Sequence, residues 1–280
     1  ELANTTTSSS TTTQCDTLSA KTVSDSSPFV AGVDSSTQSC KIVIYDPASG
    51  KIIREGRASH PDGSEVDPQA WWDAFLEAVR AAGGLDDGRA LSVGGQQHGM
   101  VCLDERGEVI RPALLWNDTR SAEAARELIL ERGDGDSEAG ARWWAQATGL
   151  VPVASFTVTK LRWVADNEPE NAREIAAICL PHDWLSWKIR GGFEAVGLEG
   201  LCTDRSDASG TGYMDRADAV YRGEILAQAL RISLKEAEAI ILPKICDPME
   251  AMGFGDPRHG WGEIAIGPGC GDNAGAALGV

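Results

Sequence analysis

Four short segments of this chain combine residue types that could bind a polar ligand or move a proton. The last of them, Gly267–Asn273, reads GPGCGDN and runs into an Ala-rich stretch. Glycine permits close backbone approach to a ligand, and a helix start offers free N–H groups. A carboxylate held there, Asp272, is placed to accept a proton from a substrate hydroxyl. For this segment alone, a glycine-capped surface turn is the favoured interpretation.

A second segment, residues 34–41, lies between two predicted strands and is rich in hydroxyl side chains. Such a turn can present N–H and O–H donors to phosphate oxygens. Asp34 is a candidate for holding Mg²⁺ through water, and Lys41 for offsetting phosphate charge. The candidate donors are Ser36, Thr37, Gln38 and Ser39. An ordinary polar hairpin loop explains the same residues, and for this segment alone it is favoured.

A third segment, Gln96–Gly99, follows a predicted strand and a pair of glycines. The side chains of Gln97 and His98 can form several directed hydrogen bonds to a polyol. Ligands of α/β sheets favour the carboxyl ends of strands. A histidine satisfied within a turn is an equally good interpretation.

The fourth segment, Leu114–Arg120, brings together an aromatic ring, a carboxylate and a guanidinium group, those of Trp116, Asp118 and Arg120. They fall where a buried strand ends and a helix begins. The alternative is a helix start capped by Asp118 or Thr119, and both interpretations can hold at once.

Composition excludes several classes of partner. The chain has 280 residues and a formal net charge of −17. That charge argues against nucleic acid, which is bound through clustered Lys and Arg, and against anionic membrane surfaces. No apolar run approaches the roughly 20 residues of a membrane span. The seven cysteines are scattered, with no CxxC pair, which favours reduced thiols in a cytoplasmic protein.

Periodicity and turn residues predict an α/β domain, a mixed sheet with flanking helices. Residues 1–28 are expected to be a disordered Ser/Thr-rich tail. A β-meander opens the domain, and a helix capped by Asp67 and ended by Gly83 follows. The remaining expected elements are a strand at 90–95, a hairpin at 100–110, helices over 119–192 around a strand at 177–180, two helices within 222–240 and a strand at 263–266.

Taken together and in order, these segments resemble the N-terminal half of the FGGY carbohydrate kinases, and among them the xylulokinase type. The similarity covers about residues 30–280. The family's D-x-G-T, Q-x-H-G, W-N-D-x-R, S-x-T-x-x-K-L-x-W and G-D-N-A-x-A-A patterns lie at Asp34–Thr37, Gln96–Gly99, Trp116–Arg120, Ser155–Trp163 and Gly271–Ala277. From its residues alone, Ser155–Trp163 is only an amphipathic helix start. Ser206–Thr211 also resembles the family, but as a polar turn it is assigned no role.

The resemblance implies a ribonuclease H-like fold of the actin and hexokinase type that uses ATP and Mg²⁺. It implies Asp272 as general base, Gln97, His98 and Asn273 as sugar contacts, and Asp34 as the Mg²⁺-associated aspartate. The implied reaction is phosphorylation of D-xylulose at its terminal hydroxyl. Ribulose, gluconate and glycerol kinases share much of this pattern, so the sugar stays open. A sugar-binding fragment without activity is the main alternative, and an actin-like assembly protein has weak support.

Two departures from the family pattern matter. Ser36 replaces the glycine of the phosphate loop, a change that we expect to be tolerated. The family's second, nucleotide-binding domain should begin just after Val280, and the sequence stops there. Residues 29–280 are therefore expected to be the sugar-binding domain of a two-domain kinase. Alone it should bind ATP poorly, show little activity and expose apolar surface that favours a homodimer.

Overall fold

The computed structural model describes residues 29–279. The expected tail and Cys15 lie outside this range. A mixed β-sheet is the largest sheet of the fold. The strand order is β13-β5-β1-β2-β3, and β14 also pairs with β5. The strands are β1 (Phe29–Ser35), β2 (Ser39–Asp46), β3 (Lys51–Ser59), β5 (Gly88–Gly95), β13 (Ala265–Ile266) and β14 (Cys270–Gly271). The predicted α/β class is confirmed.

The register of this sheet aligns three strand ends. β1, β2 and β3 form the predicted antiparallel meander. β1 and β14 both run parallel to β5, so that Ser35 and Gly271 lie on either side of Gly95. The carboxyl ends of parallel strands meet at one edge of a sheet. The segments that follow Ser35, Gly95 and Gly271 therefore emerge side by side.

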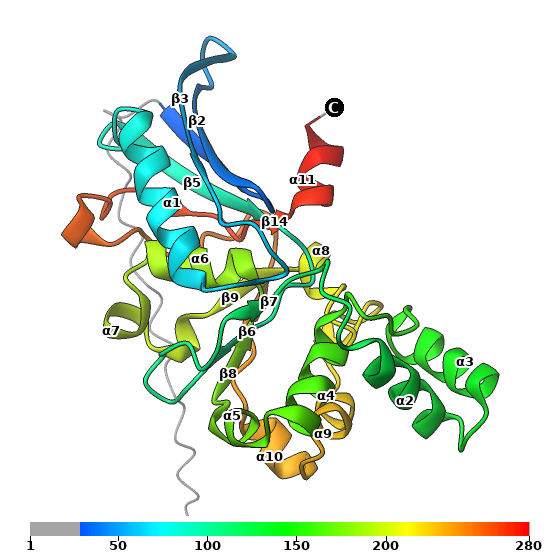
Figure 1. Cartoon of the computed structure of the whole chain (residues 1–280). Coiled ribbons are helices and arrows are strands. Elements are labelled where there is room, and N and C mark those ends of the chain that lie inside the picture. Colours follow the sequence, from blue (N-terminus) through cyan, green and yellow to red (C-terminus); the bar gives the residue numbers. More distant parts are fainter. Residues whose placement is uncertain (1–28, 280) are drawn as a thin grey trace, which may run out of the picture.

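The two faces of the sheet differ in burial. Along β1, Ala31 and Val33 are buried while Gly32 and Asp34 face the other side, as expected of a period of two. Helices α1 (Pro68–Ala81) and α6 (Pro181–Ile189) pack on the buried face. α11 (Asp272–Leu278) projects from the end of the sheet beside the other face (Figure 1). The open face is thus available for a ligand.

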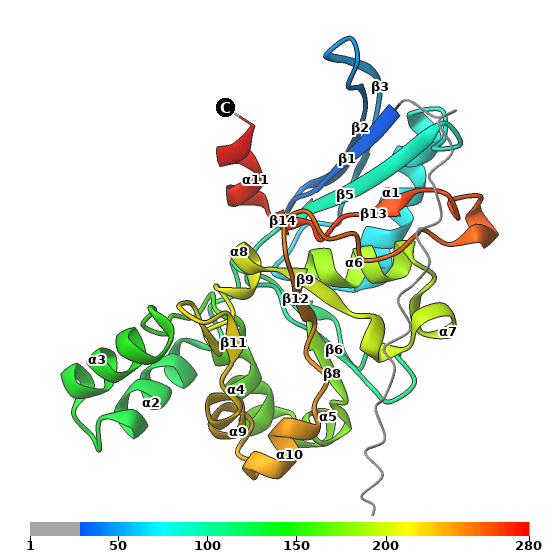
Figure 2. The same cartoon turned by 180° about the vertical axis from the view of Figure 1, so that it is seen from behind.

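A second group of helices extends the domain away from the sheet (Figure 2). These helices are α2 (Ala122–Arg132), α3 (Ser137–Thr148), α4 (Thr157–Asn167), α5 (Pro169–Glu174), α9 (Gly223–Leu230) and α10 (Leu234–Ala239). They bury their own apolar cluster around Trp144, Leu161 and Ile225. The antiparallel pair β6 (Val101–Leu103) and β8 (Ala177–Cys179) contributes residues to both cores.

Several short elements link these two parts. The helices are α7 (Gly192–Val196) and α8 (Arg205–Ala208), and the strand pairs are β4 (Glu65–Val66) with β7 (Ala113–Leu114), β9 (Cys202–Asp204) with β12 (Lys244–Cys246), and β10 (Met214–Asp215) with β11 (Val220–Tyr221). The sequence did not predict these strand pairs, because two or three residues carry no readable alternation.

Most of the longer predicted elements are confirmed, with one correction. The helix capped by Asp67 begins at Pro68, and Asp67 accepts a hydrogen bond from Gln69 N–H. The hairpin near Asp104 forms, and its first strand also pairs with β8. Part of the glycine-rich turn is itself a strand, β14, because Cys270 and Gly271 complete the ladder beside β5.

Two further expectations concern membranes and thiols. Within residues 29–279, no helix is both long and apolar enough to cross a bilayer. The six cysteines in this range are free thiols, as the sequence predicts.

The contact between β3 and α1 generates a stability prediction. A Cβ on Gly56 would lie 2.0 Å from the Ala78 carbonyl oxygen, so the strand and the helix touch backbone to backbone. Gly56→Ala should therefore lower the free energy of unfolding by about 1–3 kcal/mol, measured by urea denaturation. Gly32→Ala is the matched control, because its Cβ would meet Val43 at an ordinary 3.5 Å. Equal stabilities of the two variants would contradict this account.

Candidate active site

Asp272 stands at the edge where the three aligned strands end. It is the first residue of α11, directly after β14, and Gly271 is the N-cap. The predicted glycine-led helix start is therefore confirmed. The Asp272 carboxylate accepts a hydrogen bond from Asn273 N–H at 2.7 Å. Two cavities open beside it, one on each side, and Asp272 and Asn273 line both.

The first cavity, of about 360 Å³, is polar and is called here the small cavity. It is lined by Thr37, Gln97, His98, Trp116, Ser155, Asp272 and Asn273. Asn273 Nδ2 donates to Gln97 Oε1 at 2.7 Å, and Trp116 Nε1 donates to Thr37 Oγ1 at 3.0 Å. The structure thus brings together four of the predicted sugar contacts, those of Gln97, His98, Trp116 and Asn273. Hydroxyl, amide, imidazole and carboxylate groups in one small space suit a polyol.

His98 is held in an unusual conformation in the wall of this cavity. Its φ is +62°, a left-handed value that is uncommon for residues other than glycine. Its ring packs edge-on against Phe156, with ring centroids 5.1 Å apart. Burial, aided by the charge of Lys160, lowers the pKa of His98 to about 4. The imidazole is therefore neutral at pH 7, with one nitrogen to donate and one to accept.

The second cavity, of about 600 Å³, is called here the large cavity and lies on the open face of the sheet. Its floor consists of small residues, among them Gly32, Ser92 and Gly94. Asp34, Ser36 and Lys41 lie on its walls beside Asp272. Side chains without bulk leave room for a ligand to approach the strands closely. Ser36 does not have a positive φ, so the backbone here does not require glycine.

The two carboxylates of the large cavity influence each other. Partial burial raises the pKa of Asp272, and the negative charge of Asp34 raises it further, although the Asn273 N–H opposes the shift. Partial burial also raises the pKa of Asp34, against the attraction of His60, Arg57 and Lys41. A carboxylate whose pKa moves toward neutrality is a better proton acceptor.

The other loop residues have partners within the protein. Ser39 is buried, and its Oγ accepts a hydrogen bond from Arg57 Nε at 3.0 Å. Lys41 Nζ lies 2.9 Å from Glu55 Oε2, with both side chains largely exposed. Gln38 is exposed and, like Ser39, lies outside both cavity linings as the structure describes them. This arrangement leaves Ser36, Thr37 and Lys41 as the loop residues that could meet a phosphate.

A divalent cation fits the large cavity on one condition. Among residues 29–279, no set of three or more His, Cys, Asp or Glu side chains is arranged to hold a metal. Asp34 could supply a carboxylate there, and Asp272 is the second carboxylate of the lining. Mg²⁺ is commonly held by one or two carboxylates, waters and substrate phosphates. The residues therefore fit Mg²⁺ that arrives with a phosphate ligand.

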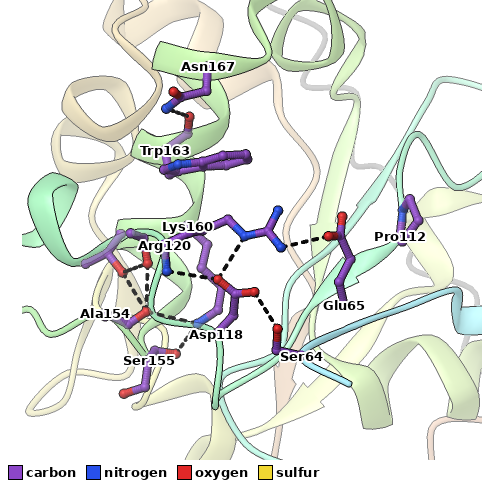
Figure 3. Close-up of polar contacts among 12 residues, drawn as sticks. Ser64, Glu65, Pro112, Asp118, Arg120, Ala154, Ser155, Lys160, Trp163 and Asn167 are labelled. Carbon is purple, nitrogen blue, oxygen red and sulfur yellow. Dashed lines mark hydrogen bonds and ion pairs between the residues drawn. The ribbon is translucent and has the colours of Figure 1, made fainter. Parts of the chain in front are cut away.

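Asp118 and Arg120 lie behind the small cavity and take no part in its lining. Asp118 is buried and accepts hydrogen bonds from Ser64 Oγ at 2.8 Å and Arg120 Nε at 2.9 Å (Figure 3). Arg120 Nη2 reaches Glu65 Oε2 at 2.7 Å. Neither predicted cap forms for the next helix, because α2 begins at Ala122 with Ser121 as N-cap. The pair holds the wall from which Trp116 projects.

The sequence-based reasoning missed two residues of this wall, Ser155 and Lys160. Ser155 lines the small cavity, and Lys160 is fully buried behind it. Lys160 Nζ donates to the carbonyl oxygens of Ala154, at 3.3 Å, and Ser155 (Figure 3). Burial lowers the pKa of Lys160 to about 7. Both residues belong to the S-x-T-x-x-K pattern, which was the available signal.

Comparisons with known proteins show what this chain is similar to. A family model for the N-terminal domain of the FGGY carbohydrate kinases matches residues 29–279. The xylulose kinase of Streptomyces coelicolor is 47% identical over 262 residues, which cover 90% of this chain and 50% of that protein. The chain spans about half the length of the curated relatives that it matches over most of its own length.

Solved structures show the same fold. The crystal structure of xylulose kinase from Bifidobacterium adolescentis matches with a TM-score of 0.86 and 50% identity, over 90% of this chain and 55% of that one. Plasmodium falciparum glycerol kinase with ADP matches with a TM-score of 0.74 and 21% identity, over 90% of this chain and 50% of that one. The expected actin and hexokinase-type fold is confirmed.

The buried charge of Lys160 generates a prediction about pH. The pKa is about 7 in the fold against 10.5 for a free lysine, so the charged form destabilises the fold. This penalty is complete below pH 7 and disappears as the pH approaches 10.5. Between pH 7 and pH 10, the wild type should therefore gain roughly 2–4 kcal/mol of unfolding free energy relative to Lys160→Met.

The measurement is urea denaturation of both proteins at several pH values. Lys235→Met, at an exposed position of α10, is the control and should run parallel to the wild type. A constant difference in unfolding free energy between wild type and Lys160→Met across this range would mean that burial of the charged Lys160 does not destabilise the fold.

Proposed function

Because this chain belongs to the FGGY family of carbohydrate kinases, we propose that it is the sugar-binding half of an ATP-dependent kinase for D-xylulose. One observation carries the proposal: Asp272 lies on both the small cavity, with its polar lining, and the large cavity with the loop of Asp34. A sugar in the first and a phosphate in the second would meet at its carboxylate. The names of the most similar relatives favour xylulose as the sugar.

The proposed chemistry uses Asp272 as the base. The terminal hydroxyl of the sugar lies at the junction of the two cavities. Its oxygen forms a bond to the γ-phosphorus, the bond from phosphorus to the β,γ-bridging oxygen breaks, and the hydroxyl proton passes to Asp272. Positioning of the two reactants supplies most of the rate in phosphoryl transfer.

The remaining residues bind and orient the reactants. Gln97, His98 and Asn273 hold the sugar hydroxyls, and the indole of Trp116 covers them. Ser36, Thr37 and Lys41 meet the phosphates, once Lys41 exchanges Glu55 for the ligand. Asp34 would hold Mg²⁺ through water, where the metal offsets phosphate charge. Asp118 and Arg120 are proposed to support Trp116 instead of contacting the sugar.

Because the chain spans about half the length of its curated relatives, activity is tested in a fusion of residues 1–280 to the C-terminal half of the Streptomyces coelicolor xylulose kinase. ADP release with D-xylulose, ribulose, gluconate and glycerol, each with ATP and Mg²⁺, tests the substrate. Fastest turnover with another sugar would replace xylulose, and binding without turnover would leave a sugar-binding module. A homodimer and a cytoplasmic location remain predictions, the former favoured by the exposed Leu278 on α11.

The role of Asp272 is tested by Asp272→Asn in the fusion. The amide keeps the size of the side chain but cannot accept the proton, so kcat should fall by about 10²–10⁴-fold. The affinity for xylulose, measured by calorimetry, should change far less. Asp136→Asn, also at a helix N-terminus and solvent-exposed, is the control. Near-normal turnover of Asp272→Asn would remove Asp272 from the mechanism.

The role of His98 is tested by His98→Ala. Loss of one hydrogen bond to the sugar should weaken xylulose binding by about 2- to 10-fold, and more if a buried partner is left unpaired. Because alanine is strained at φ +62°, His98→Asn, which tolerates this conformation better, is measured beside it together with the melting temperature. Unchanged affinity in both variants would count against His98 as a sugar contact.

A further inference from the structure

A buried histidine faces three carboxylates directly below the turn that carries Asp272. His182, the second residue of α6, is completely buried. Its Nε2 lies 3.2 Å from Asp183 Oδ1, 3.4 Å from Asp204 Oδ1 and 3.2 Å from Asp207 Oδ2. The three carboxylates come from α6, from the end of β9 and from α8. One imidazole therefore ties three elements together.

Burial and the short distances between these groups shift their pKa values. Burial alone would lower the pKa of His182, but the surrounding carboxylates outweigh it and raise the pKa well above its usual value. Burial raises the pKa of Asp183 to about 7 and also raises that of Asp207. The surrounding carboxylates therefore favour the protonated form of His182. Removing one partner of a buried ion pair leaves an uncompensated charge and is strongly unfavourable.

The turn 269–271 is contacted by His182 on one side and by Ser206 on the other. A Cβ on Gly269 would lie 2.8 Å from His182 Nδ1, so the imidazole packs directly against the turn, at a position whose φ is +78°. On the other side, Ser206 Oγ accepts a hydrogen bond from Gly271 N–H at 3.4 Å. Gly271 is the residue immediately before Asp272.

Ser206 depends on the same carboxylates. α8 has only four residues, and Asp204 caps it by accepting hydrogen bonds from Ser206 N–H and Asp207 N–H at 2.7 and 3.2 Å. A single helical turn is not stable without such support. His182 contacts Asp204 and Asp207, and Asp204 in turn holds Ser206 under Gly271.

We propose that His182 is a positioning residue: its buried contacts with Asp183, Asp204 and Asp207 fix the turn 269–271, and through it the carboxylate of Asp272. This inference rests on the proposed role of Asp272 as base. His182 does not contact the sugar or the phosphate. Its loss should affect the orientation of Asp272 more than the binding of either reactant.

The first test is amide hydrogen exchange on the 280-residue chain, and it needs no activity. His182→Gln removes the cation, His182→Lys keeps it, and His259→Gln is a control in the short 3-10 helix Pro257–His259, outside this cluster. Exchange at residues 269–273 should rise at least about tenfold in His182→Gln, recover in His182→Lys and stay unchanged in His259→Gln, while β1 and β2 exchange as in the wild type. Unchanged exchange at the turn in His182→Gln would overturn the proposal.

The second test is the kinetics of the same variants in the fusion described above. His182→Gln should lower kcat by about 10- to 100-fold with KM for xylulose within about threefold, and His182→Lys should recover most of it. A lower kcat, a higher KM and a lower melting temperature together, without recovery in His182→Lys, would show that His182 is only structural. That result would overturn the proposal. A wild-type fusion that phosphorylates no sugar would contradict only the proposed function. The exchange experiment would still test the positioning role of His182.

If His182→Gln does not fold, Ser206→Ala tests the positioning role instead. It removes the hydroxyl that accepts from Gly271 N–H and that also bonds to Asp204, and it leaves His182 in place. Faster exchange at the turn and a kcat reduced about 3- to 10-fold, at unchanged KM, would support the proposal. Wild-type exchange and kcat would overturn it.

Discussion

The pairing of β14 and β1 with the two sides of β5 is the constraint on which the candidate site depends. It sets Ser35, Gly95 and Gly271 in one row, so three segments that are distant in sequence leave the sheet at one edge. The loop after Ser35, the Gln97–His98 segment and Asp272 are these three segments. A register shift of one residue in β14 would turn the Asp272 side chain away from both cavities.

This edge is crowded, and small residues make it possible. A Cβ on Gly95 would lie 2.7 Å from that of His182, and one on Gly271 would lie 2.6 Å from Gln97 Nε2. Glycine at these positions lets α6 and the Gln97 side chain approach the strands. On the open face, Gly32 and Gly94 leave the space of the large cavity. The same edge thus combines close packing below the strands with open space above them.

The fold could be predicted from the sequence where signals were long or repeated: the meander, the helix after Asp67 and the glycine-led helix start. The motifs also predicted Gln97, His98 and Asp272 as site residues, and the structure places all three on the small cavity. The sequence could not reveal which polar residues face inward. Ser39 and Asp118 read as ligand contacts, yet their partners, Arg57 and Ser64, lie 18 and 54 residues away. The cluster around His182 escaped for the same reason, since ion pairs between distant segments leave no periodic pattern.

The span of the chain across the small cavity has a consequence for folding. Thr37 and Asn273 line the same space, and Asn273 bonds to Gln97 across 176 residues. Loop closure over such a distance carries a large entropic cost and slows folding. During synthesis, the meander emerges early. Its neighbour β5 gains its pairing with β14 only after the C-terminal part of the chain has been made. The small cavity is therefore complete only after nearly all of residues 29–273 have been made, and a chain interrupted earlier leaves the edge of β5 unpaired and open to aggregation.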